Sequence, residues 1–131
     1  GQIIEVRHSQ FDMGLLPNVF DGDTYTLVRG LEANPLVFEF AFPAPRELTG
    51  LIATFAAMDF ALKVSLTAEA STTGAAGPVV YEQTFSGLPG DPTVELRFDQ
   101  GPALVASARV EILQLNAGVD VHIHVRELIF R

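Results

Sequence analysis

Short runs of alternating apolar and polar residues extend through most of the chain, with the period of two that a half-buried β-strand requires. The alternation is clearest in residues 60–70 and 93–99. In a third run, Phe38, Phe40 and Phe42 share one face. The pattern predicts about eight strands, in residues 25–29, 36–42, 48–57, 60–70, 79–85, 93–99, 106–115 and 119–130, after a weaker alternation in residues 2–7.

The segments between the predicted strands are rich in glycine and proline, and no segment has a convincing helical period. The main competing local prediction is a helix in residues 48–58, which Thr49, Gly50 and Ile52 disfavour. Short strands separated by turns are typical of an antiparallel β-sandwich. We therefore expect an all-β fold with eight strands in two packed sheets.

The length and composition are those of one folded domain. The chain has 131 residues, 48% of them hydrophobic and 18% charged, which is enough for one hydrophobic core. We expect a single β-sandwich domain over residues 1–131. No initiator methionine or leader-like segment stands at Gly1, so we expect a domain excised from a larger protein or a processed product. No apolar run approaches the ~20 residues of a membrane helix, so we expect no membrane insertion of this segment.

The charge balance and the absence of cysteine argue against several classes of function. Sixteen acidic and eight basic residues give a net charge of −8, which repels phosphate backbones and argues against nucleic acid as a partner. The chain has no cysteine, and so no disulfide, zinc–thiolate site or thiol nucleophile. It also has no activated-nucleophile motif and no glycine-rich phosphate loop, and we expect no enzymatic activity.

Residues 18–26, Asn-Val-Phe-Asp-Gly-Asp-Thr-Tyr-Thr, concentrate acidic and hydroxyl side chains around one glycine. Asp21 and Asp23 offer carboxylate oxygens on either side of Gly22, which permits a sharp turn. Thr24 and Thr26 add hydroxyl and carbonyl oxygens, and oxygen ligands of these kinds are the ones that Ca²⁺ prefers. An ordinary solvated Asp-Gly turn fits the same residues, and the motif alone does not decide between the two.

A glutamate near the end of the chain occupies an apolar position in the alternation. Along residues 119–126 the apolar side chains face one way, and continuing the alternation places Glu127 on this core face. A buried carboxylate costs several kcal/mol unless it is paired or bound to a cation. A β-bulge near Arg126 would instead reset the register and turn Leu128 and Phe130 inward. The bulge and a metal-ligand role for Glu127 are compatible.

His122 and His124 share the polar face of the same predicted strand. Two imidazoles at this spacing occur in metalloenzymes of the cupin type. That motif also needs a distal glutamate and a second histidine motif downstream, whereas the only other histidine here is His8. We interpret the pair as a feature of the sheet surface.

Four segments together resemble the galactose-binding-like superfamily, which includes discoidin, or coagulation-factor type C, domains and many bacterial carbohydrate-binding modules. They are the acidic motif, a strand like residues 36–42, the Pro-Arg-Glu-Leu-Thr-Gly-Leu sequence of residues 45–51, and the Val-Arg-Glu-Leu sequence of residues 125–128. The likeness spans residues 4–130. It implies an eight-stranded jelly-roll β-sandwich and an extracellular or extracytoplasmic location at the cell surface.

In calcium-binding relatives the ion is held by the acidic loop and by a glutamate from the final strand. On the matching positions here, the resemblance implies that Asp21, Asp23 and Thr26 supply loop oxygens. Glu127 would close the site and tie the first quarter of the chain to the last strand. The family commonly has a tryptophan two residues after the threonine, where this chain has Val28, and the chain contains no tryptophan.

The resemblance leaves two functions open. The first is a non-catalytic carbohydrate-binding, lectin-like module with a structural calcium site. The second is a structural or protein-interaction accessory domain of a larger extracytoplasmic or membrane-anchored bacterial protein, which contacts another domain and binds no glycan. The missing tryptophan favours the second function.

The residues available for glycan binding are few. Sugar-binding members present exposed aromatics on loops, and the candidates here fit core or strand positions more easily. These aromatics are Phe11, Phe20, Tyr25 and Tyr81. The polar candidates for ligand contacts are His8, Gln10, Asp12, Arg29 and Asn34.

Overall fold

The computed structural model describes residues 4–68, 77–116 and 122–131. These residues form ten β-strands and one short 3₁₀ helix, and none of their helices has the length and apolarity of a membrane span. The predicted strand positions 2–3, 69–70 and 119–121 lie outside the described residues. The elements are β1 (Glu5–His8), β2 (Phe11–Met13), η1 (Leu16–Val19), β3 (Val28–Gly30), β4 (Leu36–Arg46), β5 (Gly50–Phe55), β6 (Phe60–Ala68), β7 (Val79–Phe85), β8 (Thr93–Arg97), β9 (Val105–Gln114) and β10 (His124–Phe130).

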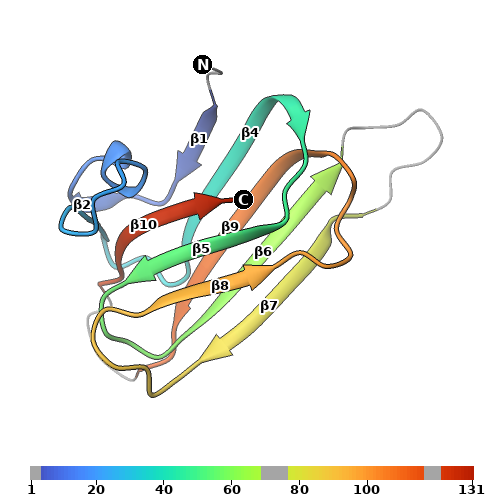
Figure 1. The fold of residues 1–131 in the computed structure, drawn as a ribbon. Coiled ribbons are helices and arrows are strands. Elements are labelled where there is room, and N and C mark those ends of the chain that lie inside the picture. The colour runs from blue at the N-terminus through green and yellow to red at the C-terminus, as the bar shows by residue number, and fades with distance from the viewer. Residues whose placement is uncertain (1–3, 69–76, 117–121) are drawn as a thin grey trace.

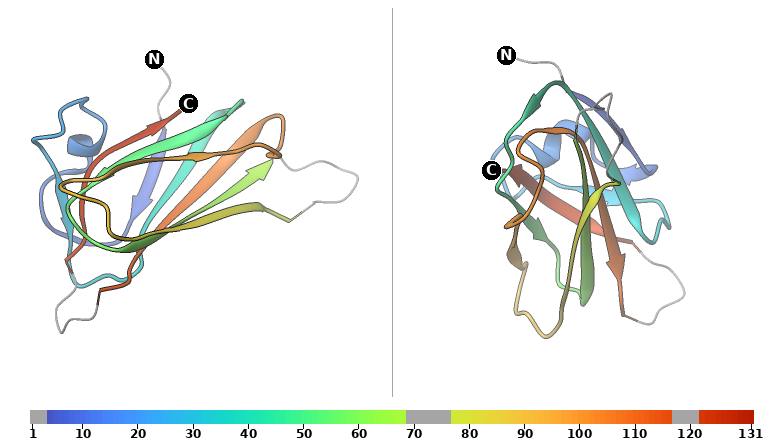
Figure 2. Two further views of the ribbon diagram at one scale, coloured as in Figure 1. Left: turned by 60° about the horizontal axis from the view of Figure 1, so that its bottom comes forward. Right: turned by 90° about the vertical axis from the view of Figure 1, so that its right-hand side faces the viewer.

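The strands make two five-stranded antiparallel sheets that pack face to face (Figures 1 and 2). The first sheet has the order β1-β4-β9-β6-β7 and the second the order β2-β3-β10-β5-β8. Neighbours such as β4 and β9 are far apart in the sequence, so the chain passes repeatedly between the sheets, as in a jelly-roll sandwich. The all-β jelly-roll prediction is confirmed, with ten strands among the described residues in place of eight.

The alternation in the sequence becomes an alternation of burial. In β6 the side chains of Leu62 and Val64 are fully buried, and Lys63 between them is half-buried on the other face. The inner faces of the two sheets meet where Phe55 of β5 contacts Phe60 of β6, with ring centroids 4.7 Å apart. One cluster of buried side chains joins the sheets. The helix considered for residues 48–58 is wrong, because β5 occupies most of that segment.

Strand pairing is interrupted, or a strand is short, where the sequence lacks alternation or a backbone N–H donor. The pairing of β4 with β9 is interrupted between Ala41 and Arg46, a stretch that contains Pro43 and Pro45. Proline has no N–H to donate to a neighbouring strand, so the ladder cannot continue through it unchanged. β2 is three residues long in a segment without alternation, which is why the sequence predicts no strand there.

A β-bulge at Arg126 sets the register of β10. The ladder with β5 shifts between Val125 and Glu127, and Leu128 returns to the core face, where it is 2% exposed. The predicted bulge is confirmed. Beyond Val125, β10 has no residue paired with β3. The segment that contains η1 packs beside this part of β10 instead (Figure 1).

Replacing Phe55 with alanine is expected to lower the free energy of unfolding by about 3–5 kcal/mol, because the ring is fully buried and links the two sheets. Urea-induced unfolding measures the change. The matched control is Leu113→Ala in β9, where the residue is 38% exposed. We expect that control to cost less than about 1 kcal/mol, and equal losses in the two variants would contradict the core position of Phe55.

Candidate functional site

The acidic motif begins in the last two residues of η1 and continues through the loop that joins η1 to β3. Gly22 has a φ of 73°, in the left-handed region that favours glycine, and it turns the chain between Asp21 and Asp23. Upstream, Gly14 has a φ of 83° and passes so close to Leu27 that a Cβ at this position would collide with the Leu27 carbonyl oxygen. The two glycines therefore let this segment close on itself before β3 begins.

Oxygen atoms converge on the hydroxyl of Thr26. Thr26 Oγ1 donates to Asp21 Oδ2 at 2.5 Å. The carbonyl oxygens of Asp23 and Asn18 lie 3.0 and 3.2 Å from the same hydroxyl. A hydroxyl has one proton, so it cannot satisfy all three oxygens at once. The Thr26 hydroxyl, and after it the Asp23 N–H, hold the pKa of Asp21 below its ordinary value, so Asp21 is charged at neutral pH.

Glu127 is buried beside this loop, and one of its carboxylate oxygens has no partner. The residue is 5% exposed, and the Gly22 N–H donates to its Oε1 atom at 3.3 Å. Oε2 is buried without a hydrogen-bond partner among the described residues. Burial raises the pKa of Glu127, the charges of Asp21 and Asp23 raise it further, and the Gly22 N–H opposes them. The fold thus brings a buried carboxylate to the acidic loop.

The donor set at this place fits a hard divalent cation. Ca²⁺ binds about 6–8 oxygens, which carboxylates, carbonyls and hydroxyl groups can supply. A cation would give Glu127 Oε2 a partner and offset the repulsion between Glu127 and the two aspartates. Within the described ranges, no group of three or more His, Cys, Asp or Glu side chains has the arrangement of a metal site by itself. A cation here would depend on Thr26 and the loop carbonyls as well.

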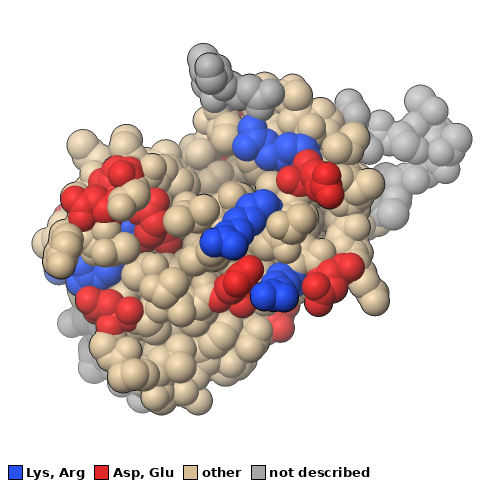
Figure 3. Space-filling view, viewed as in Figure 1, with Lys and Arg blue, Asp and Glu red and all other residues tan. Residues whose placement is uncertain are grey.

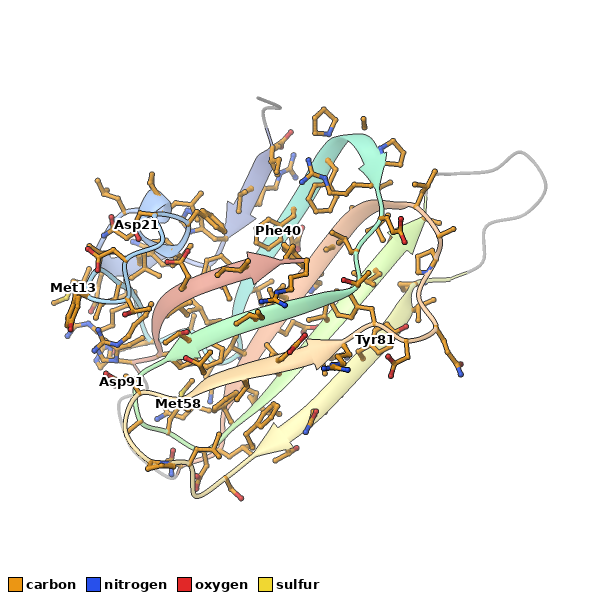
Figure 4. All side chains as sticks on the ribbon, viewed as in Figure 1. Met13, Asp21, Phe40, Met58, Tyr81 and Asp91 are labelled. Atoms are coloured by element: carbon orange, nitrogen blue, oxygen red, sulfur yellow. The ribbon has the colours of Figure 1, made fainter. Side chains whose placement is uncertain are left out.

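Arg126 holds the same loop from its other side. Its Nη1 atom donates to the Thr24 carbonyl oxygen at 2.9 Å, and its Nε atom lies 3.4 Å from Asp91 Oδ2. Asp21 and Asp91 are at the same end of the sandwich (Figure 4). Acidic side chains gather at this end, over the segment between β2 and β3 (Figure 3). Sequence reasoning missed Arg126 and Asp91, although the predicted bulge was a signal for Arg126, because a bulge re-aims side chains.

A second polar cluster lies on the outer face of the second sheet, across β2, β3 and β10. Arg29 makes a two-point ion pair with Asp12, with N–O distances of 2.7 and 3.0 Å. His122 Nδ1 lies 3.7 Å from Asp12 Oδ2, and His124 is paired with Arg29 across β3 and β10. Burial lowers the pKa of His124, and the positive charges of Arg29 and Arg126 lower it further.

Tyr25 is an exposed aromatic residue in the acidic loop. It is 91% exposed, so the expectation that it fits a core or strand position is wrong. Phe20 is also 42% exposed. Phe11 instead stacks on the ring of His8 at a centroid distance of 4.1 Å, and Tyr81 packs against the core. Tyr25 is therefore the candidate among the four with a ring free to stack on a ligand.

The structure gathers part of the predicted ligand contacts. Asp12 and Arg29 are together in the second cluster, and the exposed Gln10 follows β1 and precedes β2. His8 lies on β1, in the other sheet. Asn34 is bound to the backbone of Gln114 by two hydrogen bonds of 3.1 and 2.8 Å, at a different place in the fold. The five residues do not form one site.

No family model matches the sequence, and no curated protein matches it. Solved structures match over nearly the whole chain. The family 32 carbohydrate-binding module of AlyQ, in complex with 4,5-unsaturated mannuronic acid, has a TM-score of 0.70 at 16% identity and covers 97% of this chain and 93% of its own. The family 32 module of NanJ from Clostridium perfringens, in complex with galactose, has a TM-score of 0.67 at 13% identity. That match covers 98% of this chain and 92% of the module. The F5/8 type C domain of a Bacteroides fragilis protein has a TM-score of 0.71 at 17% identity. That match covers 97% of this chain and 89% of the matched chain.

The chain has the galactose-binding-like fold. The resemblance inferred from the acidic motif and the closing strand is confirmed at this level. At these identities the likeness concerns the fold alone. The chemistry of this domain has to be argued from its own residues.

The pKa of His124 is lowered in the folded protein, so protonation at acidic pH favours the unfolded state. The stability contributed by neutral His124 is complete above its ordinary pKa of 6.5 and is lost as the pH falls through the lowered folded-state value. Between about pH 7 and about pH 5, the wild type should lose unfolding free energy more steeply than His124→Gln. Urea unfolding at a series of pH values measures this, and parallel profiles would contradict the assigned surroundings of His124.

Proposed function

We propose that this domain is a non-catalytic carbohydrate-binding, lectin-like module with a structural calcium site. The fold supports the proposal, because similar solved structures include modules in complex with galactose and with an unsaturated mannuronic acid. The observation that carries it is the exposed ring of Tyr25. Arg126 links the loop that carries Tyr25 to the second polar cluster. It donates a hydrogen bond to the Thr24 carbonyl oxygen, and its positive charge helps to lower the pKa of His124 in that cluster.

The chemistry of this surface matches that of a sugar. A pyranose ring has an apolar face that stacks on an aromatic side chain, and hydroxyl groups that both donate and accept hydrogen bonds. Tyr25 offers the ring, Asp12 offers acceptors and Arg29 offers donors. The imidazole rings of His122 and His124 can each donate or accept a hydrogen bond. Arg29 and Asp12 already hold each other in place, so little side-chain freedom is lost when a ligand binds.

In this proposal calcium is held by oxygens of Asp21, Asp23, Thr26 and Glu127, with help from loop carbonyls. When bound, the ion supplies positive charge that offsets the three carboxylates and satisfies the buried Oε2 atom of Glu127. The loop is then tied to β10 at the bulge by two consecutive residues, Arg126 and Glu127. This arrangement fixes the backbone that carries Tyr25.

A second candidate is a structural or protein-interaction accessory domain of a larger extracytoplasmic or membrane-anchored bacterial protein. Apolar residues exposed on and beside the segment between β2 and β3 favour it. Met13 is 49% exposed, Leu15 is 72% exposed and Leu31 is 41% exposed. Such residues suit contact with another protein domain. Both candidates place the domain outside the cytoplasm.

Thermal unfolding in calcium and in chelator tests the metal site. An ion at ~100 times its dissociation constant adds about 2.7 kcal/mol to the native state, which is several degrees for a domain of this size. Glu127→Gln should abolish this difference. In chelator the same variant should unfold at a higher temperature than the wild type, because a buried charge without a partner is removed.

The control for Glu127→Gln is Glu82→Gln on β7, an exposed position where the calcium effect should persist. If the wild type unfolds at the same temperature in calcium and in chelator, the calcium proposal is rejected. It would leave the glycan proposal to its own test.

Calorimetric titration with galactose, mannuronate oligosaccharides and bacterial cell-wall sugars tests glycan binding. Tyr25→Ala should weaken binding about tenfold without loss of stability, because the ring is exposed and its role is to stack on the ligand. Leu15→Ala, at another exposed position of the same segment, should leave affinity unchanged. If the wild type binds none of these sugars, glycan binding is rejected in favour of the accessory-domain candidate.

A further inference from the structure

The outer face of the first sheet contains a polar groove that the preceding sites do not use. Two adjoining hollows of about 510 and 420 Å³ lie on this face. Arg7, Glu39 and Arg109 line both hollows, so the two share one wall. The groove is far from the acidic loop in the fold, because it lies over β1, β4, β9 and β6 of the first sheet, whereas Glu127 belongs to the second.

Strand register explains the hollow. One cross-strand row consists of Glu5, Ala41, Ser107 and Thr67, each aligned with the next on β1, β4, β9 and β6. Three of these four side chains are small. The row therefore forms a low floor across the sheet. Adjacent strands are about 4.8 Å apart, so the floor extends for roughly 14 Å across the four strands.

A second row, in which three of the four side chains are long, stands beside this floor. Arg7, Glu39, Arg109 and Ser65 are aligned in the same way on the same four strands. Arg109 Nη1 donates to Glu39 Oε1 at 2.9 Å, which holds the centre of this row in place. The two rows together, which we call the sheet-face groove, alternate donors and acceptors at short intervals.

The charge of the sheet-face groove selects among partners. Its two arginines, Arg7 and Arg109, balance its two glutamates, Glu5 and Glu39, although the whole chain has a net charge of −8. A neutral groove has no electrostatic preference for a polyanion or a polycation. An extended peptide gains affinity from the unpaired backbone of a sheet edge, and this groove lies on a sheet face instead. A neutral ligand whose groups both donate and accept hydrogen bonds fits best.

We propose that the sheet-face groove binds an extended, neutral oligosaccharide by hydrogen bonds to its hydroxyl groups, as a second carbohydrate site separate from that at Tyr25. The proposal rests on the proposed carbohydrate-binding function. No aromatic ring is aligned in either row, so each sugar residue is held by hydrogen bonds alone. The affinity therefore depends on several consecutive sugar residues in contact with the groove, and a monosaccharide binds too weakly to occupy it.

Backbone amide NMR of the full chain distinguishes the two sites. The probes are soluble neutral oligosaccharides of glucose, mannose and galactose, each compared with its monosaccharide. We expect amide shifts at Glu39, Ser107 and Arg109 with an oligosaccharide and none with its monosaccharide. Binding should not change when the salt concentration is raised, because groove and ligand are both neutral.

Ala41→Ile fills part of the groove floor with a side chain that neither stacks on a sugar nor forms hydrogen bonds, and should weaken this binding at least about tenfold, the loss expected for one or two hydrogen bonds. Ala41 is exposed on a strand, where a β-branched residue is well accommodated, so the variant should fold. The matched control is Thr84→Ile, exposed on β7 outside the groove, which should bind as the wild type does.

Unchanged amides at Glu39, Ser107 and Arg109 with every oligosaccharide would overturn the groove proposal, whether or not Tyr25 binds a sugar. The groove proposal is equally overturned if Ala41→Ile and Thr84→Ile bind the oligosaccharide equally well. Shifts confined to the groove, with none in the Tyr25 loop, would support it and reject the site at Tyr25. The two proposals therefore fail independently.

Discussion

The buried carboxylate of Glu127 is the constraint on which the arrangement of the acidic loop depends. A buried ionised group without full pairing costs several kcal/mol, a large part of the 5–15 kcal/mol by which a typical domain is stable. The single N–H that Gly22 donates to Oε1 leaves the other oxygen without a partner among the described residues. The loop has to bring its backbone to the carboxylate, and the left-handed conformation of Gly22 makes that approach possible.

The bulge at Arg126 and the shortness of β3 follow from the same constraint. Because β3 pairs with β10 only as far as Val125, the rest of that strand edge is open to the loop. Because the register shifts between Val125 and Glu127, two consecutive polar side chains reach the loop while Leu128 still enters the core. A regular strand would place one of the two polar side chains between the sheets. The irregular ladder thus combines a complete core with a polar connection between the first quarter of the chain and its last strand.

Much of this fold could be predicted from the sequence, and the limits of prediction have a physical origin. Alternation at period two locates strands such as β6. The position of Glu127 on the core-facing side of the alternation indicates the bulge. Both can be predicted because they are local features of one strand. The ion pair of Asp12 with Arg29, and the row that aligns Glu39 with Arg109, depend on which strands become neighbours. The topology of the whole sandwich decides which strands become neighbours. The periodicity of one segment does not reveal its neighbours. The exposure of Tyr25 likewise depends on how the loop packs on β10.

The missing tryptophan has a different meaning in the structure from the one that the sequence suggests. The position two residues after Thr26 is Val28, which has no exposed surface and is paired with the equally buried Val125 on the neighbouring strand of the same sheet. A residue at this position is part of the core, and its identity affects packing rather than contact with a ligand. The chain has ten phenylalanines and no tryptophan, and the rings of Phe38 and Phe40 belong to the same core cluster. The absence of tryptophan at position 28 is therefore a change in how the interior is filled, and it does not weigh against glycan binding at the exposed ring of Tyr25.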